Sequence, residues 1–387
     1  MKLSRRLREI QPFQVMALLA EARALEAAGR DIVHMEIGEP DFPTPEPVVR
    51  AARRAIEGGD VHYTPALGLP ALRERIAEFY RQRYGVEVAP RRIVVTPGAS
   101  GALLLALGAL LETGDAVMMA DPGYPCNRNF VRFLGAEPRA VEVGADTGYQ
   151  LSAALVQRHW TPDTRALLLA SPSNPTGTLV SDAELADIVR AVAQQGGELI
   201  VDEIYHGLTY DCEPATALAF SDDLFVINSF SKYFGMTGWR LGWLVAPEAA
   251  IDGIDRLAQN LFLAAPTPAQ QAALAAFDEE CLAILEQRRQ AFRQRRDYLL
   301  PALRELGFDL PVTPQGAFYL YAGCERFTDD SFAFAQRLLH EAGVAVTPGR
   351  DFGDNRPEKY LRFSCTTSLA RLEEGVRRIG KLVAGCQ

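Results

Sequence analysis

The sequence predicts an α/β fold in which a mostly parallel sheet lies between helices and is joined to a smaller α+β domain. Between residues 93 and 245, short apolar runs rich in Val, Ile and Leu alternate with helical patterns. Apolar runs without polar alternation are typical of strands buried on both faces of a parallel sheet. After about residue 275 this alternation ends, and long helical patterns surround short strands. The length of 387 residues is also more than one hydrophobic core usually organises.

Six strands are expected in the sheet, each from one short apolar run. They span residues 93–95, 116–119, 166–170, 199–201, 225–227 and 241–245. Helices are expected after the first three strands, at residues 102–111, 127–134 and 181–194. Ser181 and Glu184 form a capping-box signature at the start of the last of these helices.

The last third of the chain is predicted to be an α+β unit. It combines a long helical stretch at residues 268–306, short strands at 317–321 and 360–363, and helices at 331–342 and 369–383. A helix at residues 13–28 has no neighbouring strand, so it could pack on either domain. We place the domain boundary near residue 275. One domain then spans residues 45–275, and the other combines residues 1–44 with 276–387.

Composition and charge argue against several classes of protein. The chain has 40 Lys and Arg against 49 Asp and Glu, a net charge of −9, whereas binding to nucleic acid needs a basic surface. A local basic cluster at residues 288–296 lies in a helical pattern, and we interpret it as a solvated helix face. No run of about 18 uncharged apolar residues occurs, and the N-terminus lacks the apolar stretch of a signal peptide. We therefore expect a cytoplasmic protein without a membrane segment.

The cysteines give no sign of a metal site. The six of them are spread along the chain, at Cys126, Cys212, Cys281, Cys324, Cys365 and Cys386. No two form a C-x-x-C pair, and no histidines cluster beside them. We expect neither bound metal nor a disulfide scaffold, which fits a reducing cytoplasm.

Polar segments follow the predicted strands, and ligands of open α/β sheets bind at the carboxyl ends of strands. Residues 96–101, Thr-Pro-Gly-Ala-Ser-Gly, precede an apolar helix whose free N–H groups could hold an anion, although plain helix capping explains them as well. Residues 171–177, Ser-Pro-Ser-Asn-Pro-Thr-Gly, form a loop that presents the Asn174 amide. An Asx-turn is the alternative interpretation of Asn174.

Two further segments carry titratable side chains. Asp202 ends an apolar strand, where a carboxylate is costly unless paired, and Tyr205 follows three residues later; a helix N-cap is the alternative role for Asp202. Lys232 follows another strand among small hydroxyl residues, which suits a buried amine that forms a Schiff base. Arg240, eight residues later, suits a phosphate or carboxylate. An isolated lysine is more often a surface side chain.

In combination, these segments resemble the pyridoxal-phosphate-dependent aminotransferases of class I/II, the aspartate aminotransferase-like group of fold type I. The resemblance extends from residues 37–42, Ile-Gly-Glu-Pro-Asp-Phe, to residues 360–364, Tyr-Leu-Arg-Phe-Ser. Its most specific parts are Ser-Asn-Pro-Thr-Gly at 173–177 and Ser-Phe-Ser-Lys at 229–232 with Gly-Trp-Arg-Leu-Gly at 238–242. It implies a seven-stranded sheet in the large, cofactor-binding domain. It also implies transfer of an amino group from an L-amino acid to a 2-oxo acid through alternating pyridoxal and pyridoxamine phosphate forms.

The resemblance also implies roles for the residues around the cofactor ring. Lys232 matches the lysine that forms the internal aldimine with pyridoxal 5'-phosphate and then acts as general base. Asp202 matches the partner of the pyridinium nitrogen. Tyr205 and Asn174 match the two residues that hydrogen-bond the ring hydroxyl, and Tyr124 matches the aromatic that stacks on the ring.

The same resemblance assigns the cofactor phosphate to Ala99 and Ser100 at a helix start, with Ser229 and Arg240 beside them. Tyr63 resembles the tyrosine that reaches the phosphate of the neighbouring subunit. It therefore implies a homodimer with shared active sites.

Substrate binding is implied for three residues. Arg362 matches the arginine that grips the α-carboxylate, and Gly38 and Asn174 lie beside that group. Arg350 is a loop arginine that could serve at the entrance, although a solvated role fits it better. Aspartate, alanine, aromatic and branched amino acids all stay open as donors.

Three other functions are compatible with parts of this sequence pattern. A dinucleotide-binding dehydrogenase shares the parallel sheet, but no glycine fingerprint follows the first strand and Lys232 would have no role. A binding or regulatory protein would need a reason to keep Lys232. The strongest rival is a carbon–sulfur β-lyase, or another elimination enzyme on the same fold, because the motifs do not encode which reaction follows Cα deprotonation.

Overall fold

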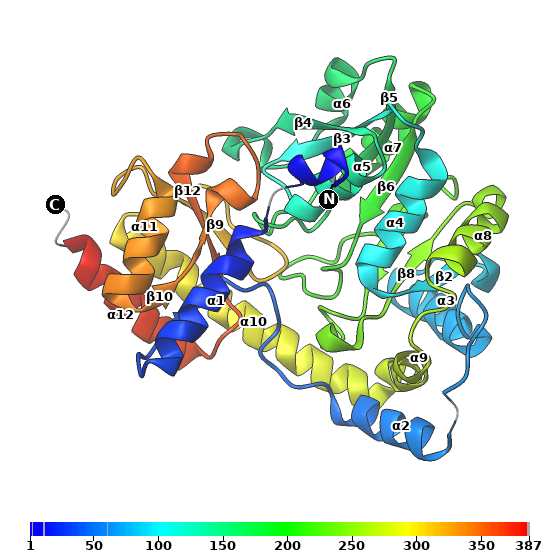
Figure 1. Ribbon diagram of the computed structural model, residues 1–387, viewed down its shortest axis with the longest axis horizontal. Coiled ribbons are helices and arrows are strands. Elements are labelled where there is room, and N and C mark those ends of the chain that lie inside the picture. Colours follow the sequence, from blue (N-terminus) through cyan, green and yellow to red (C-terminus); the bar gives the residue numbers. More distant parts are fainter. Residues whose placement is uncertain (2, 11, 60, 385–387) are drawn as a thin grey trace.

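Seven strands form a central sheet in the computed structural model, which describes residues 1, 3–10, 12–59 and 61–384. The strands are β2 (Ile93–Thr96), β3 (Ala116–Asp121), β4 (Glu137–Glu142), β5 (Thr164–Ala170), β6 (Glu198–Asp202), β7 (Phe225–Ser229) and β8 (Gly242–Val245). Their order is β2-β8-β7-β6-β5-β3-β4, and β8 runs antiparallel to both of its neighbours. The predicted mostly parallel sheet is therefore confirmed (Figure 1).

All six predicted strands are present, but the edge strand β4 was not predicted. Only Val141 is buried in β4, and its other positions include two glutamates and an arginine. Charged residues on an edge strand discourage pairing with other chains, and they also remove the apolar run that reveals a strand.

Helices cover both faces of this sheet. They are α2 (Glu46–Glu57), α3 (Pro70–Tyr84), α4 (Gly98–Leu110), α5 (Pro125–Phe133), α6 (Ala153–His159), α7 (Asp182–Gln194), α8 (Ile251–Leu261) and α9 (Thr267–Ala273). Along β5, Leu167 and Leu169 belong to the core under α3, α6 and α7, whereas Ala166 and Leu168 belong to the core under α4, α5 and α8. Burial of both faces explains why the strands show no polar alternation.

The predicted capping box at the start of α7 is half formed. The Ser181 hydroxyl accepts a hydrogen bond from Glu184 N at 3.3 Å, as predicted. The Glu184 carboxylate instead accepts from Ala153 N, the first residue of α6, at 2.6 Å. Glu184 therefore joins two helices rather than closing its own first turn.

A second, smaller set of strands lies beside the large sheet. The strands β11 (Thr347–Pro348), β12 (Tyr360–Ser364) and β9 (Tyr319–Gly323) form an antiparallel sheet, and β1 (Val33–His34) pairs with β10 (Val344–Ala345). Its helices are α10 (Glu279–Leu306), α11 (Ser331–Arg337) with a following π-helical turn (Leu338–Ala342), and α12 (Leu369–Ala384). Both predicted strands are present, but β9 begins two residues late because Ala317 has a φ of 56°, outside the β region.

The N-terminal helix α1 (Gln14–Ala27) packs on this second set, as Figure 1 shows. Leu18 and Ala22 form a small core with Ile32, Leu339 and Ala345. The division of the chain near residue 275 stays a prediction; there the chain leaves helical conformation at Asp278, between α9 and α10.

The interpretation of residues 288–296 as a solvated helix face is wrong for two arginines. Arg295 and Arg296 on α10 are 7% and 5% exposed. Arg295 forms a two-pronged ion pair with Asp41 at 2.7 and 3.0 Å, and Arg296 pairs with Asp211 at 2.9 Å. Because α10 runs beneath loops of both sheets, its arginines are buried against acidic loop residues instead of facing water.

Within the described ranges, no helix combines the length and apolarity needed to cross a membrane. The five described cysteines are free, and Cys386 lies outside the described residues.

Candidate active site

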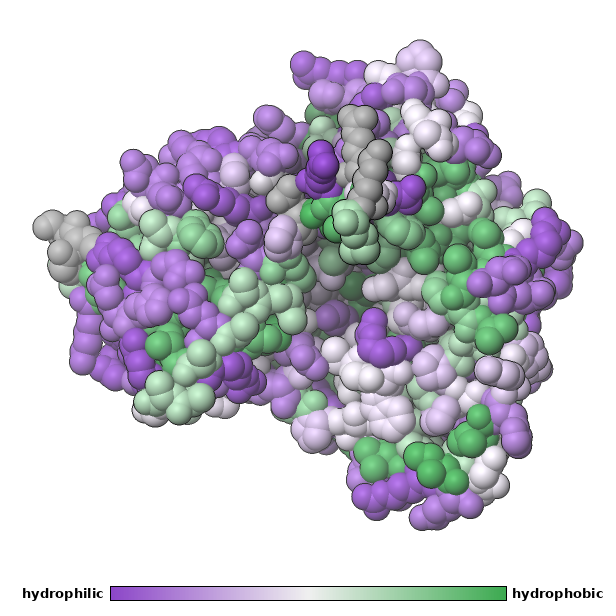
Figure 2. Space-filling model, viewed as in Figure 1, coloured by the Kyte–Doolittle hydropathy of each residue, from purple (hydrophilic) through white to green (hydrophobic). Residues whose placement is uncertain are grey.

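A cavity of about 390 Å³ opens at the carboxyl ends of β5, β6 and β7, between α4 and α1. These three strands are neighbours in the sheet, so the segments that follow them meet at one edge. Figure 2 shows the surface hollowed near the centre of this face. Of the predicted site residues, the lining includes Gly38, Ala99, Ser100, Tyr124, Asn174, Asp202, Tyr205, Ser229, Lys232, Arg240 and Arg362.

Lys232 follows β7, and its Nζ donates a hydrogen bond to the Gly38 carbonyl oxygen at 2.7 Å. Burial lowers the pKa of Lys232 to about 8, and the positive charges of Arg362 and Arg240 act in the same direction. About a tenth of the amine is therefore neutral at pH 7, far more than for an ordinary lysine, and this is the form that attacks a carbonyl and accepts a proton.

Asp202 is the last residue of β6 and is 5% exposed. Its Oδ1 accepts a hydrogen bond from Ile204 N at 3.1 Å. Burial raises the pKa of Asp202 to about 6, partly opposed by the charge of Lys232. A protonated nitrogen beside this carboxylate would stabilise its charged form, which burial disfavours.

Tyr205 and Asn174 reach the same cavity from the ends of β6 and β5. The Tyr205 hydroxyl lies 2.8 Å from the Tyr319 hydroxyl on β9. The Tyr319 hydroxyl also leaves no room for a side chain at Gly38, since a Cβ there would lie 2.0 Å from it. Tyr319 was missed by the sequence reasoning because nothing in its local pattern separates it from an ordinary core tyrosine.

One end of the cavity is built to hold an anion. Ala99 and Ser100 lie in the first turn of α4, where, within the described part of the chain, no side chain caps the helix. The Arg240 guanidinium packs against Gly98, where a Cβ would lie 2.5 Å from Nη2. The Ser229 hydroxyl accepts from Ser231 N at 3.0 Å. Free N–H groups, a helix dipole and a fixed guanidinium together favour a phosphate.

Arg362 on β12 lies at the opposite end of the cavity and is 2% exposed. Its Nη1 donates to Asn174 Oδ1 at 3.0 Å, and its Nη2 donates to Thr347 Oγ1 at 3.2 Å. The rings of Tyr319 and Phe352 lie 4.4 and 4.9 Å from the guanidinium carbon. Among the described residues, Nε is buried without a hydrogen-bond partner. A guanidinium held rigidly in this way suits a carboxylate.

The wall opposite the sheet is apolar and comes mainly from α1, which the sequence reasoning did not assign to the site. Its members are Phe13, Val15, Met16, Leu19, Ile37 and Leu103. The Phe13 ring meets Tyr124 edge-on, with centroids 6.1 Å apart. The apolar pattern of residues 13–28 predicted the helix, but not the surface that it covers.

Two predicted residues do not line this cavity. Tyr63 lies between α2 and α3 and is 85% exposed, so its side chain meets solvent in this single chain. Arg350 is exposed and lies 3.6 Å from Asp330, which agrees with the preferred solvated role.

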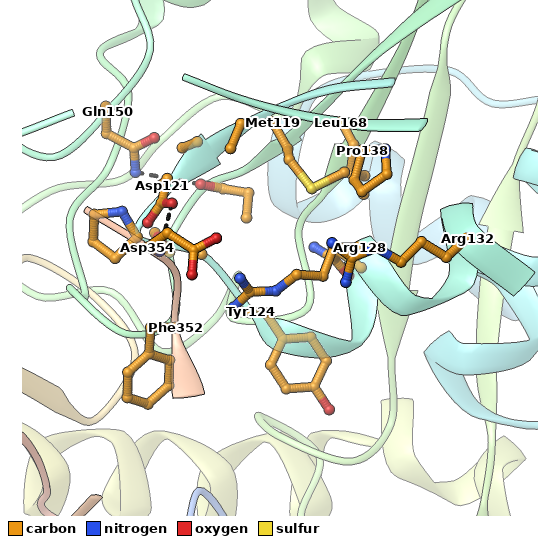
Figure 3. A pocket seen from close by; sticks show the side chains of 17 residues that line it. Met119, Asp121, Tyr124, Arg128, Arg132, Pro138, Gln150, Leu168, Phe352 and Asp354 are labelled. Carbon is orange, nitrogen blue, oxygen red and sulfur yellow. Dashed lines mark hydrogen bonds between the residues drawn. The ribbon is translucent and has the colours of Figure 1, made fainter. Parts of the chain in front are cut away.

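A smaller cavity of about 80 Å³ lies beside Tyr124 (Figure 3). Asp121, Arg128 and Gln150 line it on the side of the large sheet, and Phe352 and Asp354 belong to the loop after β11. In the part of the chain that the structure describes, no group of three His, Cys, Asp or Glu side chains could hold a metal ion.

Comparisons of the sequence and of the structure with known proteins both find aminotransferases. The sequence pattern of the aminotransferase class I and II family matches residues 30–379. A protein of Mycobacterium tuberculosis named valine–pyruvate aminotransferase is 40% identical over 373 residues, which cover 96% of each chain. A (5-formylfuran-3-yl)methyl phosphate transaminase of Methanocaldococcus jannaschii is 37% identical over 380 residues, covering 97% of this chain and 98% of that protein. The crystal structure of an aminotransferase from Mycobacterium tuberculosis superposes with a TM-score of 0.96 at 39% identity and covers 100% of both chains.

Proposed function

The chain belongs to the class I and II aminotransferases, and we propose that the 390 Å³ cavity is its active site. The protein is an enzyme that moves an amino group from an amino acid to a 2-oxo acid, with pyridoxal phosphate as cofactor. None of the relatives described above is a lyase. The assignment of individual residues and of the substrate is the proposal.

The residues that line the cavity fit pyridoxal phosphate in charge and in shape. The anion-holding end at α4 suits the phosphate, the buried Asp202 suits a protonated ring nitrogen, and the Lys232 amine suits the aldehyde carbon. When bound, the cofactor supplies a ring that withdraws electrons from the substrate Cα.

The protein's own residues hold and move protons around that ring. Asp202 keeps the proton on the ring nitrogen, and Lys232 carries a proton between the substrate Cα and the cofactor C4′. The hydroxyl of Tyr205 and the Nδ2 group of Asn174 donate hydrogen bonds to the ring hydroxyl, because Asn174 Oδ1 is already engaged by Arg362.

At the two ends, charge fixes the orientation of the reacting groups. Ala99, Ser100, Ser229 and Arg240 hold the phosphate, and Tyr124 packs on the ring. Arg362 binds the substrate α-carboxylate, which fixes one end of the substrate in the cavity that Lys232 also lines.

We propose that the amino donor has an apolar side chain. The cationic side chains of the described lining are Lys232, Arg240 and Arg362, and each already has a role, so within this chain's own lining a second substrate carboxylate finds no partner. The wall formed by Phe13, Val15 and its neighbours favours a branched or otherwise apolar donor. The valine–pyruvate name of the 40% identical relative supports this choice and supports pyruvate as acceptor.

A panel of amino donors tests the proposal. Valine, leucine, alanine, phenylalanine and aspartate are assayed with pyruvate or 2-oxoglutarate as acceptor, except that alanine is paired with 2-oxoglutarate alone. We expect kcat/KM for valine to exceed that for aspartate at least tenfold with a common acceptor. A preference for aspartate would contradict the apolar donor. Release of pyruvate and ammonia from a cysteine conjugate without any acceptor would favour the β-lyase.

We also propose a homodimer with shared sites. Tyr63 is exposed in the single chain, together with Val61, Leu261 and Leu263, each at least 50% exposed. Thr267 Oγ1 on α9 donates to the His62 carbonyl at 2.6 Å and holds this loop outward. A second copy that covers this apolar region would bring Tyr63 to its phosphate end. We further propose that residues 45–275 and residues 1–44 with 276–387 are the two domains, and that the enzyme acts in the cytoplasm.

A further inference from the structure

The first turn of α1 is held by a residue that lies far away in the sequence. Asp351 Oδ1 accepts a hydrogen bond from Gln14 N at 2.9 Å, and Oδ2 accepts from Val15 N at 2.8 Å. Phe13, at the N-cap position, makes no capping hydrogen bond with its side chain. Asp351 is 5% exposed, so its carboxylate satisfies two otherwise free N–H groups at the positive end of a helix.

This first turn forms the apolar wall of the active site. Phe13, Val15 and Met16 line the cavity, and Phe13 contacts Tyr124. Met16 is 54% exposed, so the surrounding core holds only part of the turn in place. The two hydrogen bonds to Asp351 therefore act together with the buried Val15 side chain, which is 4% exposed, to hold this first turn in place.

Asp351 is itself fixed to the large sheet. Its carbonyl oxygen accepts from Arg128 Nη2 on α5 at 2.9 Å. Phe352 O accepts from Gly123 N at 2.8 Å, and Asp354 N donates to Asp121 Oδ2 at 2.8 Å. Figure 3 shows Asp354 next to Asp121, with the side chains of Phe352, Arg128 and Tyr124 around the same small cavity.

The loop also leaves no room to shift. A Cβ at Gly353 would lie 1.6 Å from Asp121 Oδ1, so the loop backbone rests directly on that carboxylate. The Phe352 ring lies 4.9 Å from the guanidinium of Arg362. A single loop thus connects the apolar wall, the proposed carboxylate-binding arginine and the segment that carries Tyr124.

We propose that Asp351 is a positioning residue that sets how tightly the enzyme binds the donor's side chain, through the first turn of α1. This inference rests on the proposed function, because the wall matters only if the donor's side chain meets it. Loss of the two hydrogen bonds to Asp351 should weaken the binding of large apolar donors more than that of small ones. Each additional buried carbon strengthens binding about fourfold. The two extra carbons of valine therefore contribute about 15-fold in affinity that alanine does not have and that loss of the wall can remove.

The test compares Asp351→Asn with wild type, using valine and alanine as donors with 2-oxobutyrate, a 2-oxo acid without a second carboxylate, as the common acceptor. An asparagine is isosteric, but it loses the charge and its NH₂ group faces an N–H donor. We expect kcat/KM for valine to fall about tenfold or more, mainly through KM, and kcat/KM for alanine to fall less than threefold. Hydrogen exchange at the Gln14 and Val15 amides should accelerate at least tenfold. Asp351→Glu, which keeps the charge, should restore most of this protection.

Asp182→Asn is the matched control. Asp182 Oδ1, on α7, accepts a hydrogen bond from Ala215 N at 3.0 Å, and α7 does not contribute to the described lining of the cavity. This variant should lose stability without changing the ratio of valine to alanine.

The inference is overturned if the amides exchange faster while the ratio of kcat/KM for valine to that for alanine stays constant, or if Asp182→Asn changes this ratio equally. It is also overturned if exchange at the two amides does not change in Asp351→Asn. If the wild-type enzyme prefers aspartate, the proposal of an apolar donor is refuted instead. Hydrogen exchange at the Gln14 and Val15 amides then still shows whether Asp351 holds the first turn of α1.

Discussion

Asn174 Oδ1 accepts a hydrogen bond from Arg362 Nη1 at 3.0 Å, which joins the loop after β5 to strand β12 of the small sheet. The two residues are 188 positions apart in the sequence. A carboxylate bound at Arg362 therefore contacts groups from both sheets at once. Such a ligand is well placed to hold the two parts of the chain together around the reacting atoms.

We expect the cofactor to be attached to Lys232. Reduction of the holoenzyme with borohydride should fix it to the peptide that contains Lys232, because the lowered pKa, about 8, leaves that amine reactive. Peptide mass spectrometry identifies the modified residue. Lys232→Ala should lose at least a thousandfold in activity, whereas Lys381→Ala, at an exposed position of α12, should keep it. Modification of another lysine would contradict the assignment.

Asp202→Asn should keep the cofactor bound but slow transamination by at least two orders of magnitude. The phosphate contacts are unchanged, yet the charge that retains the proton on the ring nitrogen is lost, at a cost of about 3 kcal/mol or more in the transition state. Single-turnover absorbance changes measure the rate, and the cofactor content is determined on the same sample. Turnover near that of wild type would show that another group holds this proton.

Arg362→Lys should raise KM for the donor with little effect on the cofactor spectrum. A lysine cannot present two parallel N–H groups to a carboxylate, and losing one charge-assisted hydrogen bond costs about 1.5–3 kcal/mol. That is roughly 10- to 150-fold in kcat/KM. Arg350→Lys serves as control because Arg350 lies outside the described lining of the cavity. Equal effects of the two substitutions would disprove the role of Arg362.

Much of this site follows from sequence because it depends on where strands end. Asp202 and Lys232 stand at or just after buried apolar runs, and parallel strands bring their carboxyl ends to one edge. Edge strand β4 was not predicted because its charged residues interrupt the apolar run that indicates a buried strand.

The apolar wall could not be predicted, because the position of α1 depends on Asp351, which lies 337 residues from Gln14. A local sequence pattern predicts that a helix forms, but it does not predict which distant carboxylate accepts hydrogen bonds from the first N–H groups of that helix. The burial of Arg295 was unpredictable for the same reason, since its partner Asp41 lies 254 residues away.

Glu203→Gln should flatten the dependence of stability on pH. Glu203 is 1% exposed and accepts hydrogen bonds from Thr216 Oγ1 and Ala217 N, and burial raises its pKa to about 8. Between about pH 4.5 and 8 the folded protein holds a proton that the unfolded chain has released. The free energy of unfolding contributed by Glu203 therefore falls as pH rises through this window.

Urea unfolding at pH 5, 6.5 and 8 measures this effect. We expect the difference between wild type and Glu203→Gln to shift in favour of the variant as pH rises. Asp202 and His206 also titrate with shifted pKa values and interact with Glu203, so the difference between the two proteins includes the change in their titration. Glu112→Gln, at an exposed position, is the control. Parallel curves for wild type and Glu203→Gln would contradict the assignment of a raised pKa.

The proposed shared active site predicts that two inactive or impaired variants restore activity when their subunits combine in one dimer. Tyr63 lies on an exposed loop outside the cavity of its own chain, so in the proposed dimer it serves the partner's phosphate end. Tyr63→Ala should weaken cofactor binding moderately, because a phenol contributes one hydrogen bond to the anion. Lys232→Ala should remove nearly all activity.

A mixed dimer of Tyr63→Ala with Lys232→Ala contains one site that carries both substitutions and one that carries neither. Mixing the two variants under conditions that exchange subunits should therefore raise activity above the average of the separate proteins, measured at a cofactor concentration that leaves Tyr63→Ala impaired. Native mass spectrometry of one isotope-labelled variant confirms the exchange. Mixing Lys232→Ala with Asp202→Asn is the control, because both residues belong to one chain's cavity and a mixed dimer would hold no intact site. If exchange occurs without any gain in activity, Tyr63 acts within its own subunit or not at all, and the shared-site proposal is wrong.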